Sequence, residues 1–577
     1  MKKISNFFFS FFFCFIFSMI NKFFFMMYFN MENMMFIMEW EMISLISTNI
    51  VLTISLDSMS LLFMKFVLLI SSSVIYNSKS YMSSEMNLNR FIILVIMFVL
   101  SMIFLIISPN IISILLGWDG LGLISYCLVI YYQNIKSYNA GMLTALSNGI
   151  GDVMILMVIA WMMNYGSWNI IFYLSFMKND FFMNFIGVMV IIAAMTKRAQ
   201  IPFSSWFPAA MAAPTPVSSS SFFNIGNCSS LFINPLFLVF SYIFIKNFII
   251  LFGMTIINSG NWAKLEMGLK KIIALSTLSQ LGLMMSIVSM GYGKLAFFHL
   301  LTHAMFKALL FMCAGVIIHV MNDNQDIRMM GGVSIYMPMT SLCMNISNMA
   351  LCGIPFLAGF YSKDMILETV MMSNLNMLVL YLYYFSTGLT MFYTIRLMMY
   401  LMINDFNLMS IYNMYDEDYV MLKSMMILLM MSLISGSMLS WMIFYYPYMI
   451  YMSLNMKLMV IYVSLMGGFM GWMISLMNIY SMNKFLMFYN LNMFFTLMWF
   501  MPSLSVYGLN YKILNFSKNL YKNIDMGWSE MFSGQGMVEL MKNYSLISSI
   551  YQMNNFKIYL FSFVFWMMLN IMLLILI

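Results

Sequence analysis

Charged and titratable residues that lie in or beside apolar stretches are the candidates for chemistry in this sequence. Lys197 follows the apolar run FFMNFIGVMVIIAAM and precedes four prolines, at positions 202, 208, 214 and 216. Insertion of a lysine at membrane depth costs about 2.5–3.5 kcal/mol, so a lysine there is usually functional. An ionisable group beside an interrupted helix is also typical of the ion path of a transporter. The alternative is a lysine that extends to the membrane surface, with the prolines in an exposed loop.

Asp119 lies between two glycines within the apolar stretch IISILLGWDGLGLISYCLVIYY. An isolated charge is too costly to bury, so this carboxylate must be protonated, paired or hydrated. The alternative is a structural carboxylate that is hydrogen-bonded to a serine or to the backbone. A further carboxylate, Asp152, lies in the apolar segment that follows.

The segment GKLAFFHLLTHAMFKALLFMCAGVIIHV contains all three histidines of the chain. His299, His303 and Lys307 are spaced four residues apart, which places them along one face of a helix. Two histidines at this spacing could bind zinc, but the glutamate and the third ligand of such motifs are missing. A hydrated relay of titratable groups fits better, because imidazole changes its charge near physiological pH. His319, near the end of the segment, is expected at the membrane surface.

A second apolar run is interrupted at GIPFLAGF and is followed by Lys363 and Asp364. Two interrupted segments, each with a lysine, are the arrangement expected of inverted repeats. Pairing with Asp364 would lower the cost of burying Lys363. The basic pair Lys270-Lys271 opens another apolar helix, and a functional site and a helix boundary at the membrane surface are equally good interpretations of it.

The composition defines the elements that must position these residues. Of 577 residues, 63% are hydrophobic and 8% are charged, which indicates an integral membrane protein. We therefore predict an all-α polytopic membrane protein with about 15–16 transmembrane helices. Its first 110 residues are expected to hold three of them. Asp57 and Lys65 are the only charges in the second; their spacing of eight residues places them on roughly one face, but a position at the end of the helix is the preferred account. The net charge of +7 bears on orientation in the membrane rather than on nucleic acid, which we do not expect as a partner.

Residues 505–556 mix charged, polar and aromatic residues and are too polar to span a membrane. They predict a long amphipathic helix that lies along a membrane surface or along neighbouring helices. The expected organisation is then as follows: N-terminal transmembrane helices over 1–110, inverted repeats over 111–238 and 239–402, C-terminal transmembrane helices over 403–504, the amphipathic helix over 505–556, and a final transmembrane helix over 557–577.

Cysteine and methionine usage bears on redox chemistry and on origin. The six cysteines are dispersed and form no C-x-x-C pair, so neither a disulfide framework nor an iron–sulfur site is predicted. We expect the chain to bind no cofactor and no metal. Seventy-seven methionines, with many Phe, Tyr, Asn and Ile residues, indicate an AT-rich genome in which ATA encodes methionine. This favours a protein encoded in an animal mitochondrial genome.

The motifs GWDGLGLISY, TKRAQIPFSSWFPAAMAAPTPVS, FFHLLTHAMFKALLFMCAGVIIH and GIPFLAGFYSKD together resemble the chain 5 family of NADH:ubiquinone oxidoreductase, respiratory complex I. The tail motifs GWSEMFSGQG and NNFKIYLFSF are similar to the lateral helix and the last transmembrane helix of that family. The resemblance covers nearly the whole chain, and the methionine content points to an invertebrate mitochondrial genome, such as that of an insect.

The resemblance implies a fold with two inverted five-helix repeats, shared with cation/proton antiporter subunits. It also implies a proton path in which quinone reduction elsewhere in the complex drives the protonation of successive buried groups. The family's path residues fall on these positions: Asp119, Lys197, His299, His303, Lys307, Lys363 and Asp364. NADH, FMN, iron–sulfur clusters and ubiquinone would act in other subunits. The implied partners are the other membrane-arm subunits, the lipid bilayer and protons, and the implied location is the mitochondrial inner membrane.

Four positions depart from the family pattern. Gly149 replaces an arginine, so a partner for Asp152 is expected to be missing, and Arg198 replaces a small residue beside Lys197. Gly268 replaces an acid, and the family's histidine after P-T-P-V-S falls at Phe222.

Residues 219–264 also contain polar stretches where an apolar helix should continue, at 224–235 and 257–263. Reading both stretches one nucleotide later would restore apolar runs similar to the family. We therefore expect a frame slip, with natural divergence as the alternative.

Three functions are compatible with these observations. The first is a proton-translocating subunit of respiratory complex I that couples electron transfer from NADH to ubiquinone in other subunits to proton pumping. The second is a subunit of a multi-subunit cation/proton antiporter, although the lateral-helix tail argues against an independent antiporter. The third is a structural membrane-arm subunit whose channel has decayed.

Overall fold

A computed structural model of the chain describes residues 15–44 with gaps at 17, 21, 23–24, 30–31 and 33, and then residues 48–173, 180–219, 242–373, 376–407, 414–416, 418–447, 449–476, 489–553 and 555–576. The chain divides into two compact units, Met1–Pro502 and Ser503–Ile577. Of residues 219–264, where a frame slip is predicted, the structure describes only 219 and 242–264. Phe222 lies outside the described residues.

Apolar stretches of the described chain form helices, because lipid offers no hydrogen bonds to the backbone. Ten of the described helices are long and apolar enough to cross a membrane. They comprise α2 (Ser58–Tyr81), α3 (Leu88–Ile107), α4 (Ile111–Val129), α5 (Ile135–Met162), α12 (Leu269–Ser289), α13 (Gly293–Val320), α17 (Met377–Met398), α18 (Tyr419–Ile443), α19 (Leu454–Leu476) and α25 (Phe556–Leu576). Two shorter apolar helices are α7 (Phe181–Lys197) and the 248–263 part of α11 (Tyr242–Ala263). The predicted all-α polytopic fold is confirmed.

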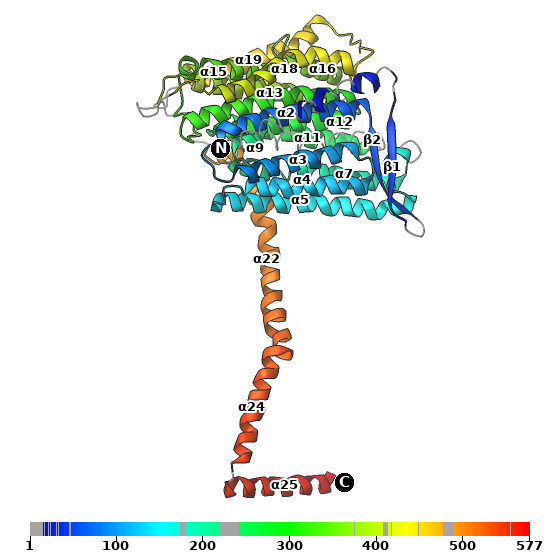
Figure 1. Ribbon diagram of the computed structural model, residues 1–577, viewed down its shortest axis with the longest axis vertical. Helices are drawn as coiled ribbons and strands as arrows, with labels where there is room; N and C mark the ends of the chain where they lie inside the picture. The colour runs from blue at the N-terminus through cyan, green and yellow to red at the C-terminus, as the bar shows by residue number, and fades with distance from the viewer. Residues whose placement is uncertain are drawn as a thin grey trace. The chain divides into compact units, whose positions relative to one another are not determined.

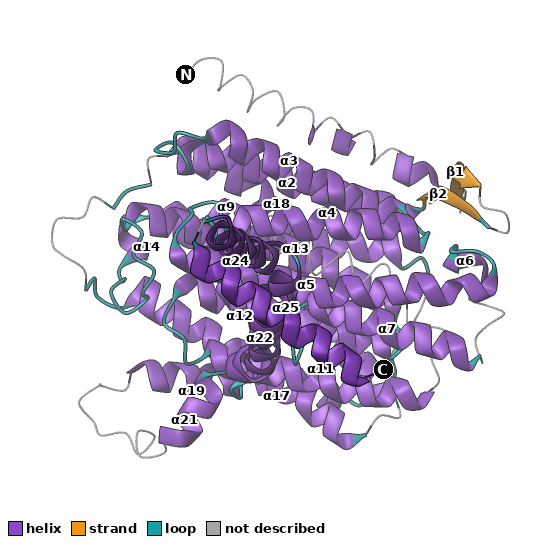
Figure 2. Ribbon diagram, turned by 90° about the horizontal axis from the view of Figure 1, so that it is seen from below, coloured by secondary structure: helices purple, strands orange, loops and turns teal. Residues whose placement is uncertain are grey.

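The long helices of the first unit run side by side in roughly one direction (Figure 1). Seen from below, α2 lies between α3 and α18, and it packs against both (Figure 2). Helices α12 and α13 lie at the centre of the first unit, and the apolar stretches of both are completely buried. Helix α13 packs against α2, α12, α18, α15 (Pro338–Cys352) and α16 (Ala358–Met372). Polar residues on α13 are therefore held on several sides at once.

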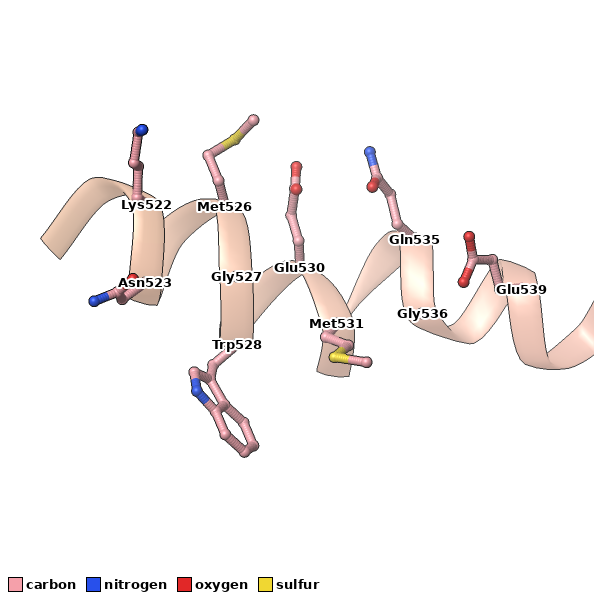
Figure 3. Close-up of a pocket in the computed structure, with 10 residues that line it drawn as sticks. All are labelled: Lys522, Asn523, Met526, Gly527, Trp528, Glu530, Met531, Gln535, Gly536 and Glu539. Atoms are coloured by element: carbon pink, nitrogen blue, oxygen red, sulfur yellow. The ribbon is translucent and has the colours of Figure 1, made fainter. Parts of the chain in front are cut away.

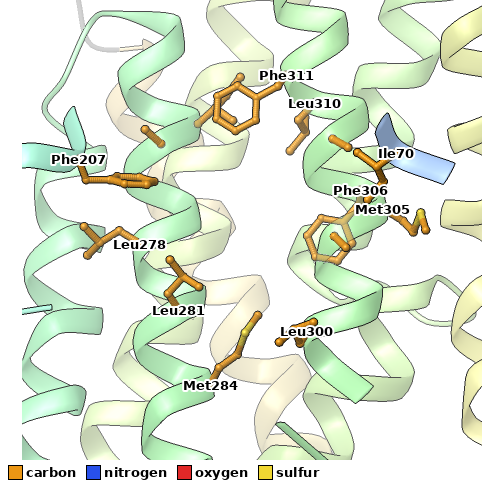
Figure 4. Packing of buried hydrophobic residues seen from close by; sticks show 14 of the residues in the cluster. Ile70, Phe207, Leu278, Leu281, Met284, Leu300, Met305, Phe306, Leu310 and Phe311 are labelled. Atoms are coloured by element: carbon orange, nitrogen blue, oxygen red, sulfur yellow. The ribbon is translucent and has the colours of Figure 1, made fainter. Parts of the chain in front are cut away.

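The apolar core fills the space around these central helices. Met284 of α12 lies close to Leu300 of α13, whereas Leu278 lies on the side of α12 that faces Phe207 (Figure 4). All four side chains are almost completely inaccessible to solvent. Burial of an apolar side chain of this size contributes about 1.5–3 kcal/mol, so this contact fixes the positions of the two helices that carry the histidines and their neighbours.

The first interrupted helix is confirmed. Helix α7 ends at Lys197, and Ala199 follows with φ = 52°. The chain continues through the short helices α8 (Trp206–Ala209), η2 (Ala210–Ala212) and α9 (Thr215–Val217). Proline cannot donate a backbone hydrogen bond and clashes with the preceding turn, which explains why the four prolines of this stretch divide it into short pieces.

The second interrupted helix is also present, between α15 and α16. Helix α15 ends at Gly353, whose φ of 81° is accessible to glycine at low cost. The start of α16 then approaches α15 closely, because a Cβ atom at Gly359 would lie 1.8 Å from the carbonyl oxygen of Ala350. Glycine at this position is what permits the two halves to pack together.

The N-terminal region differs from the prediction. Two strands, β1 (Phe36–Ser44) and β2 (Asn49–Leu56), form an antiparallel hairpin before α2. Asp57 is the N-cap of α2, the end-of-helix position expected for it, and its backbone N–H donates to Ser60 Oγ at 2.8 Å. Lys65, in contrast, is buried within α2. The period-two alternation of Glu39 and Glu41 with apolar residues, and the β-branched residues of β2, favour strands over a helix.

Short elements complete the first unit. They are η1 (Met163–Tyr165), α6 (Ile170–Tyr173), α14 (Val333–Tyr336), the π-helical stretch η4 (Met399–Ile403) and α21 (Tyr489–Thr496).

The second unit is helical over almost its whole length, as predicted for the amphipathic segment. Its elements are the π-helical stretch η5 (Ser503–Gly508), α22 (Leu509–Leu520), the π-helical stretch η6 (Tyr521–Ser529), α23 (Glu530–Phe532), α24 (Gly534–Gln552) and α25. Lys522, Glu530 and Gln535 project to one side of this helix, and Trp528 projects to the other (Figure 3). Met526 projects to the same side as these polar residues, so polar and apolar side chains are only partly separated here (Figure 3).

Candidate functional site

Lys197 is buried, with 4% of its surface exposed. Its Nζ donates a hydrogen bond to the carbonyl oxygen of Trp118 at 3.2 Å and lies 5.0 Å from the centre of the Trp118 ring. The ammonium therefore gains both a hydrogen bond and a cation–π contact from α4. A lysine that extends to the membrane surface does not fit this burial.

Two carboxylates face this lysine. The Trp118 indole N–H donates to Asp152 Oδ1 at 2.8 Å, which links α4 to α5. Asp119 Oδ1 is buried and has no hydrogen-bond partner among the described residues. The charge of Lys197 interacts with both carboxylates. The structure thus brings three helices together around one cation and two carboxylates.

The expected loss of a partner for Asp152 at Gly149 needs a correction. Trp118 supplies that partner, and a Cβ atom at Gly149 would have nothing within 4 Å. The sequence shows Asp152 as a second carboxylate but does not reveal its partner, because Trp118 precedes it by 34 residues and only helix packing joins them.

His299, His303 and Lys307 lie along one face of α13, as their spacing predicts. The rings of the two histidines are 6.1 Å apart. His299 is fully buried; its Nδ1 is 2.9 Å from Ser362 Oγ of α16, and its Nε2 is 3.1 Å from Gln280 Oε1 of α12. Neither ring nitrogen of His303 has a hydrogen-bond partner among the described residues. The two imidazoles thus have very different surroundings.

Both lysines of this region are buried and donate hydrogen bonds to uncharged oxygens. Lys307, 1% exposed, donates to Ser276 Oγ of α12. Lys363, 4% exposed, donates to the carbonyl oxygen of Leu351 at the end of α15. The end of a helix carries unsatisfied carbonyls and partial negative charge, so it is a favourable partner for an ammonium group.

Asp364 is adjacent to Lys363 in the chain, but among the described residues it makes no ion pair with that lysine within 4.0 Å. The two side chains thus form no close ion pair, although their charges interact. The hydrogen-bond partner of Lys363 is instead the carbonyl of Leu351 at the interrupted helix.

The basic pair at the start of α12 divides into two environments. Lys270 is 6% exposed and donates to the carbonyl oxygen of Ala213 at 3.5 Å, whereas Lys271 forms an ion pair with Glu266 at 3.7 Å and is half-exposed. Arg198 is also completely buried. Arg396 of α17 donates to the carbonyl oxygens of Lys264 and Glu266, which follow the end of α11.

The site contains polar residues that sequence reasoning did not identify. Gln280, Ser276 and Ser362 hold the imidazole and ammonium groups of α13. Ser276 and Gln280 are four residues apart, a spacing that places both on one face of α12, but the same helix also carries Thr277, Ser279, Ser286 and Ser289. The spacing alone therefore does not single them out. Within the described residues, no group of three or more His, Cys, Asp and Glu side chains could hold a metal ion.

The buried lysines beside two interrupted helices define a class: the antiporter-like subunits of ion-translocating membrane complexes. Solved structures agree in fold. The Mrp complex from Dietzia sp. DQ12-45-1b matches with a TM-score of 0.66 at 18% identity over 94% of this chain and 58% of that one. The archaeal membrane-bound sulfane sulfur reductase matches with a TM-score of 0.69 at 17% identity over 90% and 92%.

Family profiles and relatives define the family within this class. A profile described as NADH:quinone oxidoreductase/Mrp antiporter matches residues 108–390, one for the C-terminus of NADH dehydrogenase subunit 5 matches 393–574, and one for the N-terminus of complex I chain 5 matches 40–92. NADH-ubiquinone oxidoreductase chain 5 of Anopheles gambiae is 54% identical over 550 residues, 94% of both chains. The chain 5 protein of Locusta migratoria is 53% identical over 92% of this chain and 93% of its own. This chain belongs to the NADH-ubiquinone oxidoreductase chain 5 family, as the sequence motifs predict.

Proposed function

We propose that this chain is a proton-translocating membrane subunit of NADH-ubiquinone oxidoreductase in the mitochondrial inner membrane. Electron transfer from NADH to ubiquinone takes place in other subunits, and this chain carries the protons. The observation that carries the proposal is the placement of buried titratable groups at two interrupted helices, with Lys197 and Lys363 each 4% exposed. Buried ionisable groups are costly in a membrane and mark ion paths.

The first cluster acts as a site where one proton can be gained or lost. Lys197 lies between two carboxylates and donates to a backbone carbonyl of α4. A protonated lysine balances one carboxylate, and a change of charge on either carboxylate alters the free energy of holding that proton. Asp119 and Asp152 therefore control when Lys197 releases its proton.

The second cluster extends the path through the centre of the bundle. His299, His303 and Lys307 succeed one another along α13, and Ser362 connects His299 to the helix that carries Lys363. Groups that interact in this way titrate together, so protonation of one displaces the proton of the next. Asp364, on the same helix as Lys363, would complete the path.

The proposal is tested with Lys307→Met and Lys363→Met in the assembled complex, with proton pumping per NADH oxidised as the measurement. Methionine preserves the length and the apolar stem of lysine but cannot carry a proton. We expect pumping to fall by about a factor of ten or more, the range in which positioned proton-transfer groups contribute.

Lys271→Met is the matched control, because Lys271 is half-exposed and pairs only with Glu266. We expect it to pump normally. Normal pumping in assembled Lys307→Met and Lys363→Met complexes would contradict the proposal and favour a structural subunit with a decayed channel.

The proposed partners are the other membrane-arm subunits of the complex and the lipid bilayer. The helix over 503–552 would brace those subunits, since it carries both polar and aromatic residues and is too polar to span. We expect no cofactor in this chain, and the domain boundaries given above remain part of the proposal. A multi-subunit cation/proton antiporter is the alternative; it predicts sodium-dependent proton flux in the absence of NADH.

A further inference from the structure

His299 differs from the other histidine inside the bundle in that both of its ring nitrogens are occupied. Nε2 lies 3.1 Å from Gln280 Oε1, and Nδ1 lies 2.9 Å from Ser362 Oγ. Gln280 is 1% exposed, and His299 and Ser362 are completely buried. Three different helices, α12, α13 and α16, thus meet at one imidazole. His303, one turn along, has no such partner for either nitrogen among the described residues.

The chemistry of the two partners fixes the tautomer of the ring. The Gln280 amide presents its oxygen, which can only accept, so Nε2 must carry a hydrogen. In the neutral ring Nδ1 is then an acceptor, and the Ser362 hydroxyl must donate to it. Thr302 Oγ1 donates to Ser362 Oγ at 3.1 Å. The hydrogen bonds therefore run in one direction, from Thr302 through Ser362 and His299 to Gln280.

The same partners can also accommodate the protonated ring. A proton added at Nδ1 makes both nitrogens donors, and Ser362 Oγ must then accept. Its own hydrogen has an alternative acceptor, the carbonyl oxygen of Gly359 at 3.3 Å. Rotation of one hydroxyl is thus sufficient for the change from imidazole to imidazolium, with no unpaired donor left in either state. Nε2–H remains bound to Gln280 throughout.

We propose that Gln280 is a positioning residue that holds His299 as the Nε2–H tautomer, so that the proton enters and leaves at Nδ1, next to the Ser362 hydroxyl of the helix that carries Lys363. The inference rests on the proposed function and adds Gln280 to it. It assigns the step from α13 to α16 to His299 rather than His303. Each transfer moves one proton and one positive charge onto or off the ring, and no electron is exchanged.

The experiment compares Gln280→Met with Gln280→Glu in the assembled complex. Methionine has nearly the length of glutamine but cannot hold Nε2–H, whereas glutamate places an acceptor oxygen at the same distance. We expect proton pumping per NADH oxidised to fall about tenfold in Gln280→Met, the effect of one buried hydrogen bond that is left unmade. Gln280→Glu should pump several-fold better than Gln280→Met. Equal pumping by the two variants would overturn the proposal.

The double variant Gln280→Met/Ser362→Ala provides a second measurement. If both residues act through the same imidazole, the double variant should lose little more than the worse single variant, because such effects are not additive. If the fold-loss of pumping in the double variant equals the product of the fold-losses in the two single variants, the two residues act independently and the proposal fails. Ser289→Ala is the matched control on α12, since Ser289 is equally buried but donates only to the carbonyl of Ser286 in its own helix.

Two further variants keep the outcomes distinct. If Gln280→Met does not assemble, Gln280→Asn replaces it, because asparagine preserves the amide but is one methylene too short to reach Nε2. Normal pumping in Gln280→Asn would likewise overturn the proposal. Lys307→Met separates this inference from the proposed function. If Lys307→Met loses pumping while the Gln280 variants pump normally, only the positioning role of Gln280 is refuted. If both pump normally, proton translocation through this chain is refuted.

Discussion

At the scale of single residues, the two carboxylates near Lys197 are unequal. Both interact with the charge of Lys197, but only Asp152 is fixed by a hydrogen bond from Trp118. We therefore expect Asp152→Asn to reduce pumping at least as much as Asp119→Asn, each by severalfold, because each removes a negative charge beside the same ammonium. Pumping per NADH oxidised is the measurement, and Asp180→Asn, at an exposed helix N-cap, is the control.

A larger loss in Asp119→Asn than in Asp152→Asn would restore the order that the family resemblance implies. In that case the hydrogen bond from Trp118 would serve only to join α4 to α5.

Sequence patterns reveal the charged members of the site but not their uncharged partners. A lysine in an apolar run and two histidines four residues apart are conspicuous, because each contradicts its surroundings. Gln280, Ser362 and the carbonyl of Leu351 are ordinary in their own segments. They become partners only when helices distant in the sequence pack together, and no local periodicity encodes that packing.

Asn258 bears on the predicted frame slip. It is completely buried in α11, and neither polar atom of its amide has a hydrogen-bond partner among the described residues. An unsatisfied buried amide costs about 1–3 kcal/mol, so a native sequence rarely retains one. We expect the nucleotide sequence of this region to encode an apolar run and a histidine near position 222 when read one nucleotide later. If that frame contains stop codons, or lacks a histidine codon near position 222, no frame slip has occurred, and Asn258 and Phe222 are the true residues of this protein.

At the scale of elements, the two interrupted helices depend on close packing. A Cβ atom at Gly359 would lie 1.8 Å from the carbonyl oxygen of Ala350, whereas one at Gly149 would meet nothing within 4 Å. Gly359→Ala must therefore separate α15 from α16, at a cost of about 1–3 kcal/mol for an overpacked contact. We expect a lower melting temperature of the complex and weaker pumping, because Lys363 would lose its contact with Leu351.

Gly149→Ala is the matched control, and it should be neutral or slightly stabilising, since alanine favours a helix over glycine by about 1 kcal/mol. A stable, active Gly359→Ala complex would mean that the two halves of the interrupted helix need not touch.

The sequence predicts these interruptions because proline and glycine act locally, but it does not predict the β1–β2 hairpin. Residues 36–56 are as apolar as a helix that spans a membrane, and hydrophobicity alone favours the helix. The alternation of Glu39 and Glu41 with apolar residues carries the strand signal, and it is short. Pairing with β2 decides whether residues 36–44 form a strand or a helix. That pairing is a contact between two segments and not a property of either one.

At the scale of the whole molecule, the second unit is the part whose role lies outside the proton path. Its helix over 503–552 is almost entirely exposed and presents Lys522, Glu530 and Gln535 on one side and Trp528 on the other. A helix of this composition gains little stability alone and requires a membrane surface or neighbouring subunits to cover its apolar side. We expect its deletion to reduce the amount of assembled membrane arm severalfold, while NADH oxidation per assembled complex changes little.

The amount of complex on native gels and the turnover of the purified fraction measure these two quantities separately. The control replaces Lys522, Glu530 and Glu539 by alanine, which preserves the helix and its apolar side and should assemble nearly normally. If the deletion instead leaves assembly intact and abolishes pumping per NADH oxidised, the helix takes part in coupling rather than in bracing. The bracing role proposed for this helix would then be refuted, whereas the fold and the proposed role of the buried lysines would be unaffected.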